Sequence, residues 1–319
     1  MSTKKTPSER APENALALIA GPTASGKSDL AVRLALALQK RGREARVINA
    51  DSAQVYADLS IISARPTEAE MHGVPHLLFG AWDGAQACSA ADWAEAAKRE
   101  VFAAHDAGAV PILVGGTGLY IRTLLEGIAP IPAIDPTVRE AVRALPVAEA
   151  YAALQAEDPA RAAELNAGDS QRVARALEVV RSTGRSMLEW QQQLEGGIAD
   201  RVALAPLVLL PERETLFERC DRRFIAMVDA GALEEVEALH ARGLDADLPV
   251  MRAIGVPELG EVLRGRASMS DAIINGQRAT RQYAKRQYTW LRNQLPEEWT
   301  RLSPENVDLP IHFESLLPR

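Results

Sequence analysis

Gly21-Pro22-Thr23-Ala24-Ser25-Gly26-Lys27-Ser28 follows a short apolar run and precedes a stretch rich in alanine and leucine. These residues fit the pattern G-x-x-x-x-G-K-[ST], in which a glycine-rich loop joins a strand to a helix. The backbone N–H groups of such a loop surround phosphate oxygens, and the N-terminus of the following helix favours negative charge. We therefore predict that the loop binds a di- or triphosphate, with Lys27 as a cation and Ser28 as a ligand of phosphate-bound Mg²⁺.

The composition is that of a folded globular protein. The chain has 319 residues, 47% of them hydrophobic, which suffices for one large domain, alone or with an insertion. Cys88 and Cys220 lie far apart without a C-x-x-C pair, so neither a disulfide framework nor a zinc site is indicated. Because neither a membrane span nor a secretory signal is visible, we expect a cytoplasmic protein without a membrane partner. We also expect a monomer and a flexible tail over residues 1–14.

The charge distribution restricts any contact with nucleic acid to a local patch. The formal net charge of −7 argues against a chain that coats nucleic acid over its whole surface. Residues 272–296, however, contain basic residues and no acidic one. At about 100° per residue, a helix here gathers most of these cations on one face and two aromatic rings on another. The cations are Arg278, Arg281, Lys285 and Arg292, and the rings are Tyr283 and Trp290.

Short apolar runs alternate with helical patterns, which predicts an α/β fold with a parallel sheet flanked by helices. The runs are residues 16–20, 45–49, 110–114 and 206–210. Between them we expect a helix from Ser89 to Ala107, in which Ser89 and Asp92 form a capping pair and Gly108 ends the helix.

A proline-rich segment at residues 130–136 interrupts this alternation, and only helical patterns follow until about residue 200. We therefore predict an all-helical insertion over residues 135–200. The remaining residues, 15–134 and 201–319, form the predicted core, whose C-terminal part is helical.

Three positions could carry chemistry, and two of them follow strands, at the carboxyl edge of the sheet where ligands of such folds bind. Asp51 ends the second apolar run, which predicts a place next to the phosphate loop; it could hold metal, act as a base or cap a turn. Thr117 lies in the glycine-rich segment 115–120, which could equally be a simple strand-to-helix turn. Arg252 stands in an otherwise apolar loop, where it suits a phosphate or is an ordinary surface arginine.

Six segments occur in order along nearly the whole chain. They are the phosphate loop, Asp51-Ser52-Ala53-Gln54-Val55-Tyr56, Gly73-Val74-Pro75-His76, Gly115-Gly116-Thr117-Gly118-Leu119-Tyr120, Gln171-Arg172-Val173-Ala174-Arg175-Ala176-Leu177 and Arg281-Gln282-Tyr283-Ala284-Lys285-Arg286-Gln287. Together they closely resemble tRNA dimethylallyltransferases. The resemblance implies a P-loop NTPase-like fold that transfers a dimethylallyl group from dimethylallyl diphosphate to N6 of adenosine 37, beside the tRNA anticodon.

The resemblance also assigns roles to residues. The catalytic ones are Asp51 as general base, Thr117, and Arg252 as the phosphate-contacting arginine. The diphosphate, with Mg²⁺ on Ser28, binds Gly21, Pro22, Thr23, Ala24, Ser25, Gly26, Lys27 and Ser28. The tRNA side is formed by Asp51, Ser52, Ala53, Gln54, Thr117, Arg139, Gln171, Arg172, Val173, Ala174 and Arg175. By the same resemblance the insertion grips the anticodon stem-loop, and the reacting adenine must leave its stack to be reached.

Two segments depart from the family pattern, and two other functions compete with the one that it implies. Gly255-Val256-Pro257 lacks an aromatic residue and a cation, and Ile62-Ser63-Ala64-Arg65-Pro66 has lost a glycine. A small-molecule kinase using ATP would explain the loop and Asp51 but not the basic helix or the insertion. A nucleotide-gated RNA-binding protein would explain the loop and the basic helix, but it gives Asp51 no role.

Overall fold

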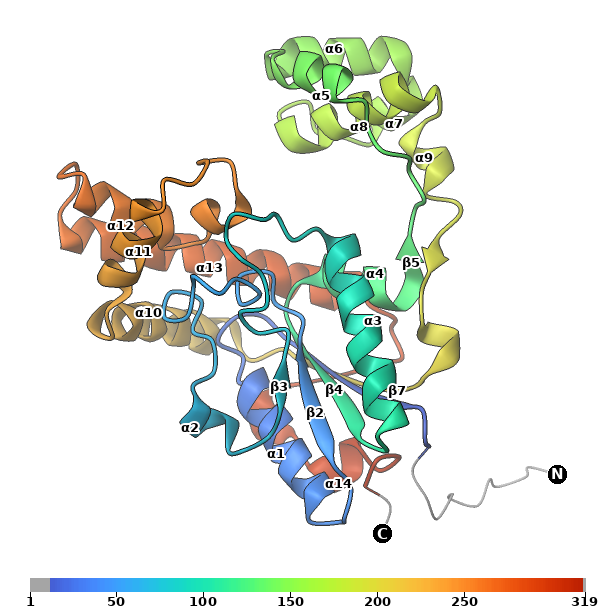
Figure 1. Cartoon of the computed structure of the whole chain (residues 1–319), viewed down its shortest axis with the longest axis vertical. Helices are drawn as coiled ribbons and strands as arrows, with labels where there is room; N and C mark the ends of the chain where they lie inside the picture. Colours follow the sequence, from blue (N-terminus) through green and yellow to red (C-terminus); the bar gives the residue numbers. More distant parts are fainter. Residues whose placement is uncertain (1–11, 318–319) are drawn as a thin grey trace. The chain divides into compact units, whose positions relative to one another are not determined.

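The structure, a computed structural model, describes residues 12–317 and divides the chain into two compact units (Figure 1). One unit combines Met1–Leu124 with Ala199–Arg319, and the other is Leu125–Ile198. The second unit thus begins before the predicted start of the insertion at residue 135. Of the predicted flexible tail, residues 1–11 lie outside the described residues. Asn14 is attached to the first unit, because its side chain donates to the carbonyl of Arg201 (3.0 Å) and its carbonyl accepts from Ala203 (2.9 Å).

The first unit contains a six-stranded sheet in the order β3-β2-β4-β1-β7-β8, in which every pair is parallel. The strands are β1 (Ala15–Ala20), β2 (Ala45–Asn49), β3 (His76–Leu77), β4 (Val110–Gly115), β7 (Ala203–Leu209) and β8 (Thr300–Leu302). The four predicted strands are confirmed as β1, β2, β4 and β7. The edge strands β3 and β8 were not predicted, because two or three residues are too short to show a period of hydrophobicity.

The strand order shows how Asp51 comes to lie near the phosphate loop. The loop follows β1 and Asp51 follows β2, with β4 between these two strands. Asp51 nevertheless acts on the charge of Lys27 and lines the same cavity as Thr23, in agreement with the predicted place next to the loop. Sequence order does not determine the order of strands within a sheet, because crossover helices allow either neighbour.

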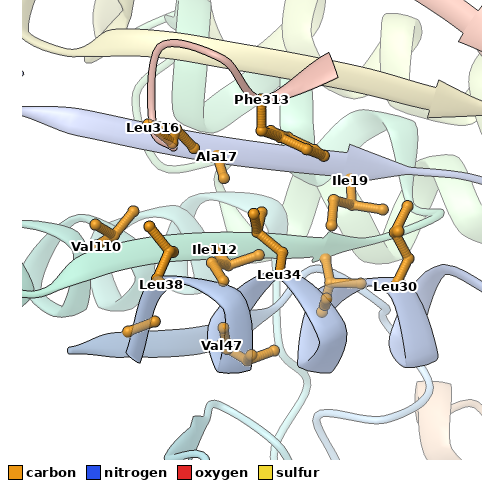
Figure 2. Close-up of a cluster of buried hydrophobic side chains, with 14 of the residues drawn as sticks. Ala17, Ile19, Leu30, Leu34, Leu38, Val47, Val110, Ile112, Phe313 and Leu316 are labelled. Atoms are coloured by element: carbon orange, nitrogen blue, oxygen red, sulfur yellow. The ribbon is translucent and has the colours of Figure 1, made fainter. Parts of the chain in front are cut away.

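A buried cluster of hydrophobic side chains packs the helix after the phosphate loop against the sheet (Figure 2). Helix α1 (Lys27–Gln39) contributes Leu30, Leu34 and Leu38, which follow one another at a spacing of four and so share one helix face. They pack against alternate residues of the strands, and Phe313 and Leu316 near the C-terminus complete the cluster. Burying a side chain of this size contributes about 1.5–3 kcal/mol. Since α1 begins directly after the loop, this packing fixes one end of the loop.

The other helices of this unit surround the sheet and its carboxyl edge (Figure 1). They are α2 (Glu68–Met71), α3 (Ala90–Asp106), α4 (Gly118–Glu126), α10 (Arg213–Asp229), α11 (Ala232–Ala241), α12 (Val256–Leu263), α13 (Met269–Asn293) and α14 (Leu309–His312). The predicted capping pair of α3 is confirmed, because Ser89 and Asp92 form a reciprocal capping box. Within the described residues, no helix is both long and apolar enough to cross a membrane.

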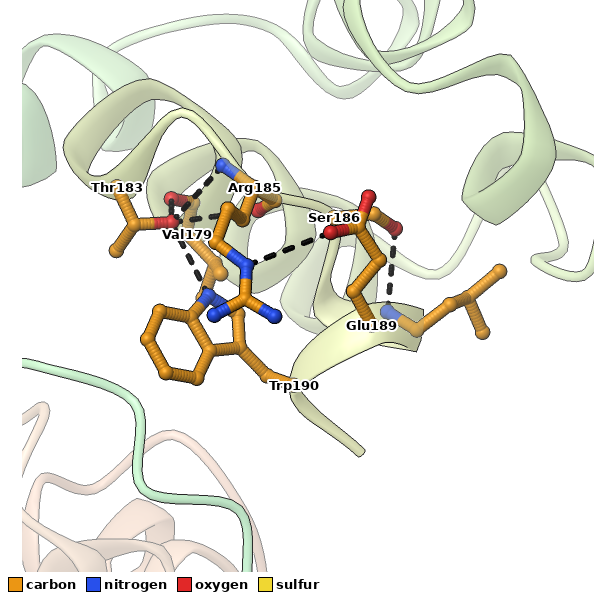
Figure 3. A network of polar contacts seen from close by, with 7 residues as sticks. Val179, Thr183, Arg185, Ser186, Glu189 and Trp190 are labelled. Atoms are coloured by element: carbon orange, nitrogen blue, oxygen red, sulfur yellow. Dashed lines mark hydrogen bonds and ion pairs between the residues drawn. The ribbon is translucent and has the colours of Figure 1, made fainter. Parts of the chain in front are cut away.

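The second unit is mainly helical, with α5 (Pro136–Arg143), α6 (Val147–Glu157), α7 (Pro159–Ala163), α8 (Ser170–Thr183) and α9 (Met187–Trp190). The prediction of an all-helical insertion missed one antiparallel pair, formed by β5 (Gly127–Ile128) and β6 (Glu195–Gly196), which joins the two ends of the unit. At the end of α8, the Thr183 hydroxyl accepts from the Trp190 indole (3.2 Å), and the Arg185 guanidinium lies over the same ring (Figure 3).

Candidate active site

The phosphate loop has the backbone of an anion cradle. Ala24 and Gly26 both have positive φ (60° and 83°), a conformation that turns successive N–H groups in one direction. Gly26 then precedes the first residue of α1, whose dipole points the same way. The Ser25 hydroxyl is buried and has no hydrogen-bond partner among the described residues, so the loop contains one polar group that is not satisfied by the protein.

Lys27 is buried beneath this loop, where its Nζ donates to the carbonyl of Pro22 (3.3 Å). Burial lowers the pKa of Lys27 to about 8, although the nearby Asp51 carboxylate acts in the opposite direction. An anion on the loop would favour the charged form again. The buried lysine is therefore suited to a ligand that brings negative charge.

Asp51 is held in place by the residue that ends β2. Its backbone N–H donates to Asn49 Oδ1 (2.9 Å), and Asn49 Nδ2 donates back to the Asp51 carbonyl (3.0 Å). Asn49 itself is completely buried, and its carbonyl accepts from the Trp93 indole (2.9 Å). The Asp51 side chain accepts from Ala53 N through Oδ1 (3.0 Å). The carboxylate is thus oriented by a rigid, fully bonded support.

The turn after β4 has glycines where neighbouring groups approach too closely for a side chain. A Cβ on Gly115 would lie 2.1 Å from the carbonyl oxygen of Ala50, and one on Gly118 would lie 2.3 Å from the Trp290 ring. This close packing brings the Thr117 hydroxyl to the segment after β2, where it accepts from the backbone N–H of Ser52 (3.0 Å). Segment 115–120 is therefore more than a strand-to-helix turn, because it joins the end of β4 to the segment that follows β2.

Gln287 on α13 joins this turn to the phosphate loop. Its Oε1 accepts from Thr23 N (2.8 Å), and its Nε2 donates to the carbonyl of Gly116 (3.0 Å). The side chain is buried, with 5% exposed. Gln287 belongs to a segment quoted for the family resemblance, but sequence reasoning did not assign it a role, since both partners are far away in the chain.

A cavity of about 350 Å³ opens at the carboxyl edge of the sheet. Its apolar lining residues are Leu59, Ile62, Met227 and Ile254, together with the rings of Tyr56, Tyr120 and Tyr283. Its polar lining residues include Thr23, Asp51, Ser52, Arg223, Arg252 and Arg286. Among the lining residues that the structure describes, Asp51 is the only acidic one. A volume of this size is typical of a small-ligand site.

Arg223 was missed by sequence reasoning. It donates to the carbonyl of Ser63 (2.9 Å), and within residues 12–317 it has no carboxylate at ion-pair distance. Burial lowers its pKa, while the Asp51 charge opposes that shift. A signal was present, because Arg223 lies directly beside the buried stripe of α10 formed by Leu216, Cys220, Phe224 and Met227. A cation on an apolar helix face indicates a buried anion or a ligand.

The cations of α13 are distributed differently from the prediction. Arg281, predicted to lie on the free basic face, is paired with Asp221 of α10 and is therefore partly neutralised. Arg286, which the prediction left outside that face, lines the cavity. The Tyr283 phenol also lines the cavity, and burial together with the Asp51 charge raises its pKa to about 12, so that it stays protonated.

The residues assigned to tRNA by resemblance fall into both units. Ser52 and Ala53 line the cavity, whereas Gln54 is buried, with its amide donating to the carbonyls of Ser63 (3.1 Å) and Ala64 (2.9 Å). Arg139, Gln171, Arg172, Val173, Ala174 and Arg175 lie in the second unit. Val173 is completely buried in that unit's core, which contradicts a direct contact of its side chain with tRNA.

Of the two segments that depart from the family pattern, one lines the cavity with Ile62 and Ser63, and the other, Gly255-Val256-Pro257, directly follows the lining residue Ile254. The Ser63 hydroxyl donates to the carbonyl of Leu59 (2.7 Å), so it is engaged within the loop. Gly255 has a φ of 100°, and a Cβ there would lie 2.3 Å from Ile62 Cδ1. Val256 and Pro257 then begin α12, and Val256 is completely buried. Arg252, at the end of the preceding turn, is half-exposed and lies 3.8 Å from an Asp247 carboxylate oxygen.

No group of three or more His, Cys, Asp or Glu side chains suited to a metal ion is found within the described residues. Mg²⁺, however, commonly takes only one or two protein oxygens and completes its shell with phosphate oxygens and water. The half-buried Ser28 in the first turn of α1 offers one such oxygen. The donor set therefore fits a Mg²⁺ that arrives with a phosphate ligand.

Comparison with known proteins gives one consistent result. Residues 54–294 match the family model described as IPP transferase. A tRNA dimethylallyltransferase of Erythrobacter litoralis is 62% identical, with 98% of each chain covered, and one of Novosphingobium aromaticivorans is 66% identical, with 87% of this chain and 99% of the relative covered. The crystal structure of a tRNA isopentenylpyrophosphate transferase from Bacillus halodurans has a TM-score of 0.67 at 33% identity, covering 95% of this chain and 97% of that one. A eukaryotic dimethylallyltransferase acting on tRNA has a TM-score of 0.79 at 26% identity, covering 94% of this chain and 77% of that one.

Proposed function

Because the chain belongs to the IPP transferase family, we propose that it transfers a dimethylallyl group from dimethylallyl diphosphate to N6 of adenosine 37 in tRNA, with release of diphosphate. One observation carries the proposal: the lining of a single cavity combines apolar side chains, several cations and one oriented carboxylate. These are the features that an apolar allyl group, a diphosphate and a proton-losing amine require. We further propose that the protein acts as a monomer in the cytoplasm, where it meets the anticodon stem-loop of its substrate.

The diphosphate would lie on the phosphate loop, close to Lys27. Arg223 and Arg252 line the adjoining cavity and add positive charge there. As the bond between the allylic carbon and the diphosphate oxygen breaks, the electron pair leaves with the diphosphate. Fixed cations in a site of low polarity stabilise this developing charge strongly. When bound by Ser28, Mg²⁺ would add a further positive charge on the phosphate oxygens.

The adenine would enter the same cavity from the side of Asp51. As N6 bonds to the allylic carbon, it loses a proton, which the Asp51 carboxylate accepts. The Ala53 N–H bonded to Oδ1 and the support by Asn49 hold this carboxylate in one orientation. A positioned general base typically contributes about 10²- to 10⁴-fold in rate. Leu59 and Ile62 would cover the allyl group and keep water from the reacting carbon.

The kinase alternative has less support. Such enzymes hold Mg²⁺ with an acidic residue in addition to the loop hydroxyl. Here β4, the strand beside β1, ends in Gly115, and Gly116 and Thr117 follow, so this strand does not end in a carboxylate. The cavity is also largely apolar next to its cations, which a nucleoside triphosphate does not require.

The test is a transfer assay with two readouts. The purified protein and Mg²⁺ are incubated with unmodified tRNA that has adenosine at position 37 and with radiolabelled dimethylallyl diphosphate, and ATP turnover is measured in parallel. Label in the tRNA without ATP consumption is the expected result. ATP turnover without label in the tRNA would overturn the proposal and favour the kinase.

A further inference from the structure

The second unit contains one buried carboxylate that three arginines share. Glu178 on α8 is almost completely buried, with 1% exposed. Its Oε1 accepts from Arg143 Nε (2.9 Å), while its Oε2 lies 3.7 Å from Arg175 Nη1 and 4.0 Å from Arg139 Nε. Arg139 and Arg143 come from α5, one helical turn apart, so the carboxylate draws side chains of two helices to one place.

The three arginine side chains are partly exposed to solvent, whereas the Glu178 carboxylate is buried. The exposed fractions of the Arg139, Arg143 and Arg175 side chains are 47%, 66% and 42%, against 2% for Glu178. One negative charge offsets only one of the three positive charges. Arg139 and Arg143 face Glu178 with Nε, so the terminal nitrogens of both remain available, and within residues 12–317 they have no other acceptor.

We propose that Glu178 is a positioning residue that holds these three arginines as one cluster for phosphates of an RNA backbone. The inference rests on the proposed function, which supplies RNA as the partner. Half-exposed guanidinium forks bind phosphate oxygens in pairs, and an ordered fork loses less entropy on binding than a free side chain does. Arg143 and Glu178 are assigned by this contact geometry; only Arg139 and Arg175 were expected from the family resemblance.

Arg185 provides a matched control, because it belongs to the same unit and its side chain is similarly exposed (45%). It stacks on Trp190 (Figure 3), and its ion pair is with Glu189 rather than with Glu178. Arg143→Gln and Arg185→Gln therefore change the charge equally. The measurement is the fluorescence anisotropy of a labelled anticodon stem-loop hairpin, titrated with the full-length protein at several salt concentrations, without a prenyl donor.

We expect Arg143→Gln to weaken binding by roughly three- to tenfold and to reduce the slope of log affinity against log salt by about 0.7–0.9, the contribution of one phosphate contact. Arg185→Gln should change neither quantity by more than the experimental error. Equal effects of the two variants would show that only net charge matters, and this would overturn the cluster.

For Glu178→Gln, simple electrostatics and a positioning role predict changes of RNA affinity in opposite directions. The substitution removes one negative charge from the unit, so simple electrostatics predicts tighter RNA binding. A positioning role predicts weaker binding and a smaller salt slope, because the three side chains lose their common anchor. Glu178→Asp keeps the charge but withdraws the carboxylate by one methylene, and the same weakening is expected. Circular dichroism identifies which variant folds, and binding as tight as wild type by a folded variant would overturn the proposal.

Failure of this inference and failure of the proposed function give different results. Wild-type protein that binds the hairpin through the cluster but transfers no dimethylallyl group to tRNA would contradict the proposed function alone. Wild-type protein that transfers the group, while the Arg143 and Glu178 variants bind RNA like wild type, would contradict the cluster alone.

Discussion

Replacing Gln287 tests whether the phosphate loop is held by α13. In Gln287→Met the side chain keeps its approximate length but loses both hydrogen bonds, so the half-buried Thr23 N–H and the buried Gly116 carbonyl lose their partner. A buried group left unpaired costs about 1–3 kcal/mol, so the two together predict a loss of about 2–6 kcal/mol in the free energy of unfolding. The exposed Gln282 of the same helix provides the control.

The assay is urea unfolding followed by tryptophan fluorescence, for which Trp290 lies one turn from Gln287 on α13. The KM for dimethylallyl diphosphate is measured alongside, and it should rise because the loop is no longer fixed at Thr23. Gln282→Met should stay within about 0.5 kcal/mol of wild type. If Gln287→Met gives the same small change and an unaltered KM, the loop does not depend on this residue, and the reasoning is refuted.

Three further outcomes are expected. Asp51→Asn should reduce the rate of transfer by about 10²- to 10⁴-fold while pyrophosphate affinity, measured by calorimetry, is kept; normal transfer would remove Asp51 as the base. Burial lowers the pKa of Lys27 to about 8, and a diphosphate favours the charged form of its side chain. The affinity for pyrophosphate should therefore fall as the pH rises above 8. The protein should also take up protons when it binds pyrophosphate, which calorimetry in buffers of different ionisation enthalpy measures. Because the pKa of Lys27 is about 8 in the folded protein and 10.5 ordinarily, the unfolded chain binds more protons than the folded protein between these two pH values. Lys27 should therefore add to the free energy of unfolding as the pH rises from 8 to 10.5. A pyrophosphate affinity that does not change with pH would contradict both statements. Gly118→Ala would place its Cβ 2.3 Å from the Trp290 ring and should cost about 1–3 kcal/mol in thermal or urea unfolding, whereas no measurable loss would show that α13 shifts freely.

The parts of the fold that local sequence determines were predictable. The phosphate loop is a motif with its own backbone geometry. The strands β1, β2, β4 and β7 are apolar runs that are long enough to be distinguished from the turns on either side. The capping box at Ser89 is likewise a local signal. The position of β4 between β1 and β2 was not predictable, because it depends on which face each crossover helix occupies.

The site was predictable where a residue belongs to a motif and obscure where its role comes from distant contacts. Asp51 and Thr117 were identified from their places after strands, and the structure puts both at the end of the sheet that carries the cavity. Gln287 contacts Thr23 across 264 positions in the sequence, a distance at which no periodicity or spacing operates. Arg223 was missed because a charged residue on a helix is normally read as solvated, although its buried stripe indicated otherwise.

The link between Gln287 and Thr23 has a consequence for synthesis of the protein on the ribosome. The phosphate loop leaves the ribosome among the first parts of the chain, but its partner on α13 is made only after most of the sequence has been translated. Phe313, which packs against the sheet beneath the loop, follows later still. A nascent chain therefore has no complete catalytic cavity, and a product truncated before α13 is expected to bind diphosphate poorly, so that activity begins only with the finished polypeptide.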